Sequence, residues 1–471
     1  MSPIKNPNLD SVTTVNEDGS HYVLHPADVT GRFMIARRIF AILLLVVYVV
    51  LPWITINEAP AVFIDILKRQ FHFFGITLAP QDLWVLFFGI TGVGFALFFL
   101  TALLGRLWCG WACPYTVFLE HVFRRIERLI DGDSSARKKL DQASWKFPKI
   151  WRRVIKHALY IVIAALLAHV FLSYFVSLER LYGYVQKNPR DHLGAFGVVA
   201  FLTAAFYFCF AHFREQFCIM VCPYGRLQSA MTDDDTVIIG YDEKRGEPRG
   251  KATDPNAGSC IDCRRCVNVC PTGIDIRDGL QMECIGCAAC VDACDDIMRK
   301  LHRPTGLVRY DSMNGLEGKK RRFLRPRLFI YAILGLIGLT VLSFTVFTKA
   351  RPYTVGISRM TGMPFYLDDT SVRNNYQLRM INKRNQPATF TVRILEAPKG
   401  FELAGGEQTI PVAARKEISR PAIVLVPKEL YPGPCEITLE VIGQPDDVRI
   451  THKVKFVGPN PASLRKKDDE Q

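Results

Sequence analysis

Three features that the sequence lacks narrow the classes of protein to which it can belong. There is no C-x-x-C-H motif, which excludes a c-type haem attachment site. No G-x-G-x-x-G follows a strand pattern, so a dinucleotide-binding fold is not expected. The first apolar run begins only at Ile39, after a polar segment too long for the n-region of a signal peptide. We therefore expect no cleavable signal peptide.

Histidine is also scarce, with 10 in 471 residues. His169 falls in the outer half of an apolar run, and no other run carries a histidine at the same depth. A relay of bis-histidine haems across a membrane therefore lacks its ligands.

The composition combines two properties that seldom occur together in soluble proteins. Half of the chain is hydrophobic (49%), yet the net charge is +14. A membrane protein with basic cytosolic loops has this combination, and a nucleic-acid partner is not expected. A length of 471 residues argues against a single compact domain.

The cysteines carry the strongest chemical signal. Residues 260–294 contain two copies of C-x2-C-x2-C-x3-C, the pattern that ligates [4Fe–4S] clusters in bacterial ferredoxins, with the fourth cysteine of each run serving the other cluster. Crossed ligation assigns quartet 1 to one cluster: Cys260, Cys263, Cys266 and Cys294. It assigns quartet 2 to the other: Cys270, Cys284, Cys287 and Cys290. Zinc also binds four cysteines, but the tandem order and the proline after Cys270 favour two clusters, and hence single-electron transfer.

Five apolar runs are long enough to cross a bilayer. They are Ile39–Ile56, Leu83–Leu104, Ala158–Val176, Ala195–Phe213 and Leu328–Phe347. The loop 106–153 carries eleven Lys and Arg, against two in 57–81 and three in 177–194. The positive-inside rule then predicts a cytosolic N-terminus, cytosolic clusters and an external C-terminal domain. Iron–sulfur thiolates also need the reducing side of the membrane.

A second motif, C-x3-C-P-Y, occurs twice at the cytosolic ends of the second and fourth spans, each time shortly after an arginine. Its cysteines, here called the CxxxCP thiols, are Cys109, Cys113, Cys218 and Cys222. Residues four apart share a helix face, and the proline ends the helix, so each pair is expected at the membrane edge. Four converging soft thiolates suit Cu(I), zinc or an iron–sulfur cluster. Four buried, unreactive thiols beside helix-ending prolines are the alternative.

After residue 349 the pattern changes to short alternating strands separated by Pro, Gly and Asn, which favours an immunoglobulin-like β-sandwich. The predicted fold is an integral membrane α-helical bundle of five spans, with an inserted cytosolic 2[4Fe–4S] ferredoxin-like domain and a C-terminal immunoglobulin-like β-sandwich. The predicted parts are a cytosolic N-terminal segment (1–36), a four-span core with both CxxxCP motifs (37–232), a linker (233–259), the ferredoxin-like domain (260–300), a basic linker (301–327), the fifth span (328–348), the periplasmic β-domain (349–460) and a disordered tail (461–471).

These residues together carry a family resemblance. The order GRLWCGWACPYTVF, CIMVCPYGRLQ, the tandem cluster motif, a fifth span and a β-rich tail resembles the cytochrome c oxidase accessory proteins called CcoG, FixG or RdxA. The resemblance covers nearly the whole chain from about residue 20. The chain departs from the plain ferredoxin pattern in one place, where Asp295 instead of proline follows Cys294.

The resemblance implies a multi-pass protein of the bacterial inner membrane that reduces Cu(II) to Cu(I) for assembly of cbb3-type cytochrome c oxidase. It makes the CxxxCP thiols the candidate copper site and catalytic centre, and the two [4Fe–4S] clusters the electron supply. The implied partners are a cytosolic electron donor, the lipid bilayer, and copper chaperones or oxidase subunits.

Two other functions fit the same residues. A quinol-linked electron carrier similar to NapH would use the same core, although the missing haem and the β-domain count against it. An assembly scaffold with structural or sensory clusters would need no electron transfer to the CxxxCP thiols.

Overall fold

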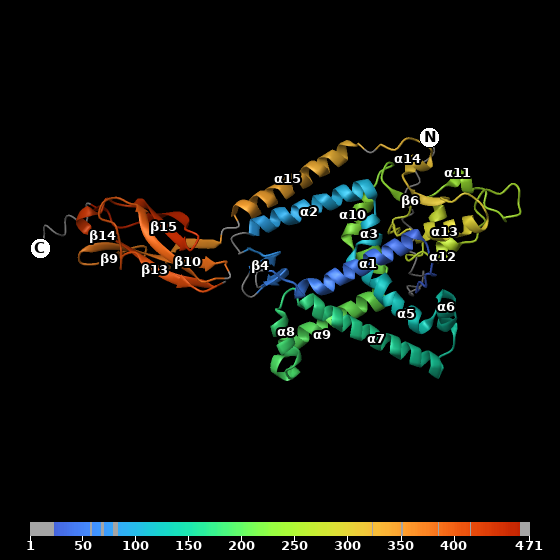
Figure 1. The fold of residues 1–471 in the computed structure, drawn as a ribbon, viewed down its shortest axis with the longest axis horizontal. Helices are drawn as coiled ribbons and strands as arrows, with labels where there is room; N and C mark the ends of the chain where they lie inside the picture. Colours follow the sequence, from blue (N-terminus) through green and yellow to red (C-terminus); the bar gives the residue numbers. More distant parts are fainter. Residues whose placement is uncertain are drawn as a thin grey trace. The chain divides into compact units, whose positions relative to one another are not determined.

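The computed structural model describes residues 23–56, 59–66, 70–78, 83–322, 324–349, 352–384, 386–414 and 416–461, so the predicted disordered tail lies almost wholly outside the described residues. The chain divides into two compact units, Met1–Phe344 and Thr345–Gln471. The first contains the long helices and the cysteine motifs, and the second is built of strands (Figure 1).

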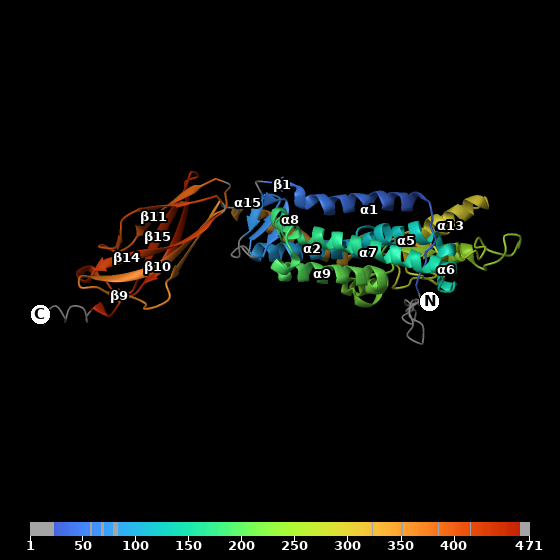
Figure 2. The same ribbon diagram turned by 90° about the horizontal axis from the view of Figure 1, so that it is seen from below.

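Among the described residues, five helices are long and apolar enough to cross a membrane. They are α1 (Arg32–Val50), α2 (Leu83–Leu104), α7 (Phe147–Leu172), α9 (Leu193–Tyr207, continued by a π-helical turn, Phe208–Phe213) and α15 (Pro326–Lys349). Every predicted span overlaps one of them, but α1 begins before Ile39 and ends before Ile56, where the chain turns into strand. α7 and α9 lie side by side in both views (Figure 1 and Figure 2).

Two of these helices touch through glycine. A Cβ atom built on Gly338 of α15 would lie 2.8 Å from the Cα atom of Gly92 on α2. The two backbones can approach this closely only because neither residue has a side chain, as is common between membrane helices. α2 and α15 therefore form a close pair within the first unit (Figure 1).

Short elements connect the long helices. The described strands between α1 and α2 are β1 (Thr55–Ile56), β2 (Ala59–Pro60), β3 (Val62–Asp65), β4 (Gln70–Phe73) and β5 (Ile76–Leu78). After α2 come α3 (Leu107–Trp111), α4 (Pro114–Phe118), a π-helical turn (Leu119–Phe123), α5 (Arg124–Asp131) and α6 (Ser134–Gln142). α8 (Leu178–Val185) precedes α9, and a second π-helical turn (Phe217–Val221) leads into α10 (Pro223–Met231).

The ferredoxin-like domain is larger than the sequence predicts. It contains α12 (Arg265–Asn268) and α13 (Ala289–Lys300), and also β6 (Ile238–Tyr241), α11 (Glu243–Gly246), β7 (Val308–Asp311) and α14 (Met313–Leu316). β6 and β7 pair antiparallel, and Ile239 and Val308 join a buried core that contains cysteines of both quartets. Segments 233–259 and 301–327, predicted as linkers, thus supply folded parts of this domain, because their short apolar strands bury themselves against it.

The cluster domain also fixes the start of α1. The carboxylate of Asp292, on α13, accepts hydrogen bonds from the backbone N–H groups of Phe33 (3.3 Å) and Met34 (2.8 Å). The first N–H groups of a helix have no partner inside the helix, and the positive end of its dipole favours an anion. A buried aspartate of the cluster domain therefore caps the first long helix.

The second unit is a sandwich of two antiparallel sheets. One sheet has the strand order β12–β14–β10–β8, with β9 paired to β10, and the other has the order β13–β11–β15–β16. The strands are β8 (Tyr353–Arg359), β9 (Tyr366–Leu367), β10 (Ser371–Asn382), β11 (Ala388–Glu396), β12 (Glu402–Leu403), β13 (Gln408–Val412), β14 (Glu417–Pro427), β15 (Cys435–Gln444) and β16 (Val448–Phe456). Alternating residues such as Leu378 and Phe390 fill the core, as the period-two pattern predicts.

Candidate redox site

The eight ferredoxin-type cysteines surround two neighbouring cavities. The first, of about 20 Å³, is lined by the four thiols of quartet 1, and the second, of about 10 Å³, by the four thiols of quartet 2 together with Cys266. Cys294 thus lies with Cys260 and Cys263, and Cys270 with Cys284, although each is far from these partners in the sequence. This is the arrangement that crossed ligation needs.

The two cluster loops repeat the same backbone winding. Asp262 (φ 52°) and Gly286 (φ 65°) precede the second cysteine of each triplet, and Arg264 (φ 54°) and Ala288 (φ 60°) follow it. Left-handed residues at both positions curl the loop around the cavity, at a strain cost for every residue except glycine. The third cysteine of each triplet lies in the first turn of α12 or α13, so only the first two are on irregular loop.

The donor chemistry of these cavities fits iron–sulfur clusters. Burial raises the pKa of Cys284 and Cys294 to about 12, and backbone N–H groups of the loop, such as that of Gly286, partly oppose the shift for quartet 2. Metal must therefore displace protons from these thiols, and the N–H groups remain as donors to the bound sulfurs. Thiolates in an apolar setting with N–H donors are the surroundings that such clusters use.

Crossed ligation can be tested with two double variants. We expect the wild type to hold about eight iron atoms per chain, and Cys263→Ser with Cys294→Ser to hold about four, because both ligands belong to quartet 1. Cys263→Ser with Cys270→Ser should lose nearly all iron, because it damages both quartets. Uncrossed ligation predicts the reverse for the two variants, and iron analysis with EPR of the reduced protein tells them apart.

The two C-x3-C-P motifs share one backbone geometry. The N–H of Cys113 donates to the carbonyl of Trp108 (2.9 Å), and the N–H of Cys222 donates to that of Phe217 (2.8 Å), both spanning five residues. Cys113 (ψ 122°) and Cys222 (ψ 109°) are extended, as residues before proline are expected to be. The helix thus breaks at the second cysteine, so the two thiols of a pair do not share a regular helical face as the sequence suggests.

The two motifs are also locked together by the tyrosine that follows each proline. The hydroxyl of Tyr115 contacts the carbonyls of Cys209 (2.8 Å) and Arg214 (2.6 Å), just before the second motif. The hydroxyl of Tyr224 contacts that of Thr101 (2.9 Å), on the helix before the first motif. The two motifs, which are repeated in sequence, are thus also joined by reciprocal contacts.

The four CxxxCP thiols lie close enough to affect one another's protonation. Burial raises the pKa of Cys109 to about 11 and that of Cys218 to about 12, and neighbouring CxxxCP thiols add to both shifts. The Arg106 guanidinium opposes both shifts, and a Cβ atom on Gly225 would lie 2.9 Å from its Nη2. The Cys109 thiol donates to the amide oxygen of Gln228 (2.9 Å), which α10 brings from the second repeat.

The spacing of these thiols matters for what they can bind. In the described part of the chain, no three His, Cys, Asp or Glu side chains are grouped tightly enough to hold a single metal ion, the ferredoxin quartets included. The spacing of the CxxxCP thiols therefore does not distinguish them from the ferredoxin-type cysteines.

The first C-x3-C-P motif is in direct contact with quartet 2. Gly110, between the two cysteines of the motif, has no room for a side chain: a Cβ atom there would lie 2.6 Å from the carbonyl oxygen of Ile285 and 2.9 Å from the Cα atom of Cys287. Cys109 and Cys287 belong to the same buried apolar core. A ligand of quartet 2 and a CxxxCP thiol are therefore separated by little more than one layer of backbone.

Hydrogen bonds hold this contact in place. Arg37 of α1, which is 2% exposed, donates from Nε to the carbonyl of Gly110 (2.6 Å). The indole N–H of Trp111 donates to the hydroxyl of Tyr310 (3.2 Å). That hydroxyl in turn donates to the carbonyl of Gly286 in the cluster loop (2.6 Å). Side chains from α1 and β7 thus fix the approach of the motif to the loop.

The sequence analysis identified the cysteines but missed the residues that join the two sites. Gly110, Arg37, Tyr310 and Gln228 carry no motif of their own. The one available signal was Arg106, an arginine placed shortly before the first motif just as Arg214 is before the second. Contacts between segments so distant in the chain follow from the tertiary fold alone.

Three family models match the chain. They are described as "4Fe-4S binding domain" (residues 85–131), "4Fe-4S dicluster domain" (213–313) and "IG-like fold at C-terminal of FixG" (343–459). The first covers one C-x3-C-P motif, and the second covers the other motif together with the tandem cysteines. The chain thus contains 4Fe–4S domains followed by an immunoglobulin-like domain.

Similar proteins share most of the chain's length. "Protein RdxA" of Cereibacter sphaeroides is 35% identical over 389 residues, which cover 79% of this chain and 82% of that protein. "Nitrogen fixation protein FixG" of Rhizobium meliloti is 33% identical over 443 residues, or 82% of each chain. "Protein RdxB" of Cereibacter sphaeroides is 34% identical over 425 residues, covering 85% of this chain and 88% of that protein.

Proposed function

Because the chain belongs to the FixG and RdxA family of iron–sulfur redox proteins, we propose that it passes single electrons from two [4Fe–4S] clusters to copper bound at the CxxxCP thiols, reducing Cu(II) to Cu(I). Copper is the substrate in this proposal. The Cu(I) produced would serve the assembly of a cbb3-type cytochrome c oxidase.

The observation that carries the proposal is the contact of Gly110 with the cluster loop. It places Cys109 in one buried core with Cys287, a predicted ligand of quartet 2. Fixed, buried contacts of this kind provide a short route for an electron and little structural change when it moves. The cluster held by quartet 1, in the adjoining cavity, would pass electrons to the cluster held by quartet 2, because Cys266 lines both cavities.

The chemistry of the acceptor end supports copper. Thiolates stabilise Cu(I) more than Cu(II), so a thiol site favours the reduced ion. The clusters, when bound, supply the single electrons that this reduction consumes. Cys109 and Cys218 have raised pKa values, so binding of copper must release their protons, and Arg106 stabilises the thiolates that result.

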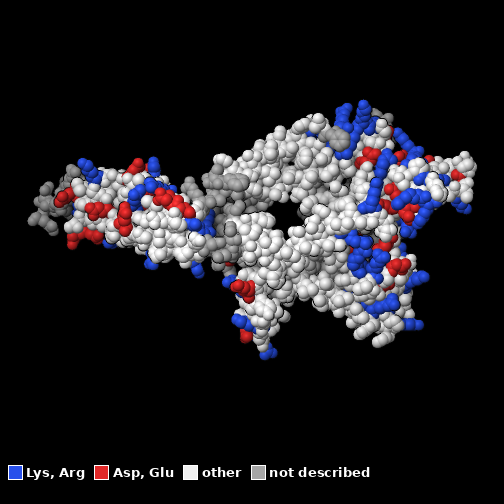
Figure 3. Space-filling model, in the orientation of Figure 1, with Lys and Arg blue, Asp and Glu red and all other residues white. Residues whose placement is uncertain are grey.

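The distribution of charge supports a location in the bacterial inner membrane. Figure 3 shows basic side chains gathered at the end of the first unit that carries the cluster domain, while the middle of this unit is almost free of charge. We propose that this basic end faces the cytosol, where an electron donor reaches the clusters. The β-domain would then face the periplasm and contact a copper chaperone or an oxidase subunit.

The experiment is a single-turnover assay on the full-length, detergent-solubilised protein. After reduction of the clusters and removal of excess dithionite, one equivalent of Cu(II) is added with a Cu(I)-specific chelator. We expect one equivalent of chelated Cu(I) to appear while the reduced-cluster EPR signal falls by about half, since one of the two one-electron clusters is reoxidised. Clusters that stay reduced in the presence of Cu(II) would contradict the proposal and favour a scaffold with structural or sensory clusters.

One observation favours a second function, a quinol-linked electron carrier. A cavity of about 230 Å³ beside quartet 2 is lined by Cys284 and Arg106, and its other walls include apolar residues such as Leu104, Met282 and Tyr310. This cavity lies at the end of α2. Its size and its apolar walls suit a planar organic ring. If a quinol analogue reduced the clusters without dithionite, this would support quinol as the source of the electrons.

A further inference from the structure

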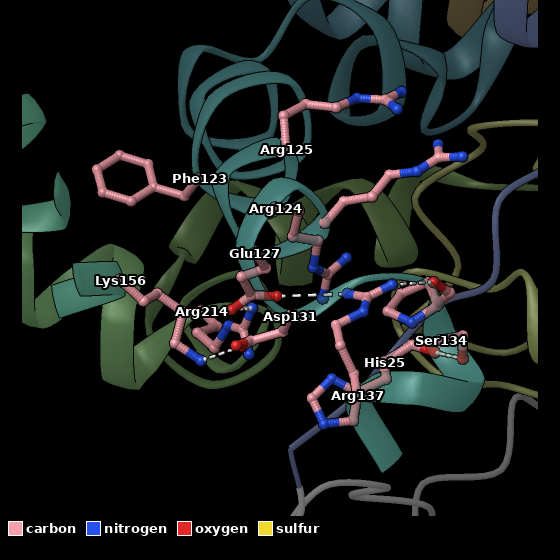
Figure 4. A network of polar contacts seen from close by, with 12 residues as sticks. His25, Phe123, Arg124, Arg125, Glu127, Asp131, Ser134, Arg137, Lys156 and Arg214 are labelled. Atoms are coloured by element: carbon pink, nitrogen blue, oxygen red, sulfur yellow. Dashed lines mark hydrogen bonds and ion pairs between the residues drawn. The ribbon is translucent and has the colours of Figure 1, made fainter. Parts of the chain in front are cut away.

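A second, smaller cavity, close to the residues next in sequence to Cys270 and Cys290, has a strongly basic wall. It measures about 60 Å³ and lies between the residues before α1, the helices α5 and α6, and the cluster domain. Its wall contains five arginines and only two carboxylates: Arg37, Arg124, Arg125, Arg128 and Arg137 against Asp28 and Glu120. Figure 4 shows part of this region, with Arg124 and Arg125 on α5 and Arg137 nearby. We call it the arginine pocket.

Three of these arginines are buried and held by other partners. Arg37 donates to the Gly110 carbonyl, and Arg124 donates to Glu215 (2.9 Å) and to the carbonyl of Pro271 (3.0 Å). Arg137 donates to the carbonyl of Pro26 (2.9 Å) and lies 3.4 Å from Glu127. Their guanidinium groups are thus fixed before any ligand arrives, which lowers the entropy cost of binding.

The same three arginines still have unused donors. They are 2%, 6% and 4% exposed, and each has one buried nitrogen without a hydrogen-bond partner among the described residues: Nη2 of Arg37, Nε of Arg124 and Nε of Arg137. A buried N–H of a cation without an acceptor is costly, so a ligand that accepts from it gains that energy. No described residue supplies that acceptor.

The positive charge in the pocket is only partly neutralised. Within the wall, Asp28 pairs with both Arg125 (3.6 Å) and Arg128, and Glu120 pairs with Arg124. From outside the wall, Glu215 also pairs with Arg124, and Glu127 with Arg137. Burial lowers the pKa of Arg125, and the nearby Arg38 lowers it further. Burial, followed by the charge of Arg37, lowers the pKa of the adjacent His121 to about 4, so this histidine adds no further charge at neutral pH. The arginines repel one another, and an anion would relieve that repulsion.

We propose that the arginine pocket binds a small oxyanion, the phosphate or carboxylate group of a small molecule. Arginine forks match the paired oxygens of both groups. A volume of 60 Å³ is room for a few water-sized atoms, enough for one such group and too little for a nucleotide. This binding site goes beyond the proposed electron transfer and does not depend on copper.

The position of the pocket couples this anion to the clusters. Its wall includes Pro271 and Ala289, the neighbours in sequence of Cys270 and Cys290 in quartet 2. Reduction adds a negative charge to a cluster there, which repels an anion in the pocket. By linkage, the oxyanion binds less tightly to the reduced protein and makes the cluster harder to reduce. This coupling rests on the proposed ligation of quartet 2, whereas the binding itself does not.

The binding is tested by equilibrium dialysis of the oxidised full-length protein in detergent against radiolabelled inorganic phosphate, and in a second arm against acetate. We expect saturable binding in at least one arm, and the arms show which oxyanion the pocket prefers. Arg125→Gln, or Arg128→Gln on the same wall, should weaken it roughly tenfold, because each removes a charged donor. Asp28→Asn should tighten it, since a competing carboxylate is removed.

The control is Lys138→Gln, which removes an exposed positive charge on α6 outside the pocket and should leave binding unchanged. Absence of saturable binding in both arms would overturn the proposal. So would equal weakening by Lys138→Gln and Arg125→Gln, which would mark diffuse surface attraction. With the clusters reduced and the dithionite and its sulfite products removed, we expect roughly fivefold weaker binding; equal affinities in the two redox states would overturn the coupling.

Discussion

Replacing Gly110 with alanine is expected to slow Cu(II) reduction by the cluster-loaded protein at least roughly tenfold while the iron content stays at the wild-type level. A Cβ atom at this position would lie 2.6 Å from the carbonyl oxygen of Ile285 and 2.9 Å from the backbone of Cys287. Backbone atoms cannot rotate away as a side chain would, so the motif and the cluster loop must separate. Electron transfer is steeply sensitive to that separation.

Alanine at position 110 should not lower the activity by destabilising the helix. Gly110 lies in the helical turn α3 and has no positive φ, so alanine would favour its helix by about 1 kcal/mol. The matched control is Gly197→Ala on α9, where nothing lies within 4 Å of the added atom. Reduction of Cu(II) at the same rate by both variants would mean that the contact at Gly110 is not on the electron's route.

Glu127→Gln is expected to destabilise the first unit by about 3–5 kcal/mol. Glu127 is 4% exposed on α5, and its carboxylate pairs with Arg214 (2.5 Å) and accepts from the Tyr160 hydroxyl (2.8 Å). Figure 4 shows it at the centre of a polar network that joins α5 to the segment before the second motif. The amide would leave the buried Arg214 charge without its counter-charge, and a buried unpaired cation is far more costly than the pair.

Thermal unfolding in detergent, followed by circular dichroism, measures the effect. Glu317→Gln serves as the control, because Glu317 forms an exposed pair with Lys319 and its loss should leave the unfolding midpoint nearly unchanged. Burial acts to raise the pKa of Glu127, but Arg214 and Tyr160 outweigh it and lower that pKa from 4.5 to about 2. The carboxylate therefore stabilises the fold above pH 4.5 and loses that effect as the pH falls toward 2. Equal midpoints for the two variants at pH 7 would contradict this role.

The sequence predicted those parts of the fold that depend on local patterns. Apolar runs located five long helices, period-two alternation located the main strands of the sandwich, and the prolines of the C-x3-C-P motifs marked helix breaks. The cysteine spacing predicted both quartets, because three ligands of each are close in sequence and the tandem repeat indicates the distant fourth. The family resemblance then indicated an iron–sulfur redox protein, in agreement with the relatives found.

Other parts of the fold and of the site could not be predicted from local sequence patterns, because they depend on contacts between distant segments. Segments 233–259 and 301–327 look like polar linkers, since β6 and β7 are four residues each and acquire their apolar core only by pairing. Gly110 looks like any other glycine until the cluster loop is placed against it. The arginine pocket combines residues from the N-terminal segment, α1, α5, α6 and the cluster domain, and no periodicity connects them.

The most direct test is a stopped-flow comparison of the wild type with a variant in which Cys109, Cys113, Cys218 and Cys222 are all serine and all eight ferredoxin-type cysteines are kept. Both proteins are reduced, freed of dithionite and mixed with Cu(II), and cluster reoxidation is followed together with formation of chelated Cu(I). We predict that the wild type reoxidises its clusters as Cu(I) forms, whereas the variant keeps its iron and its reduced clusters. Reoxidation by the variant at the wild-type rate would show that copper takes its electron elsewhere and would contradict a role for the CxxxCP thiols as the acceptor site.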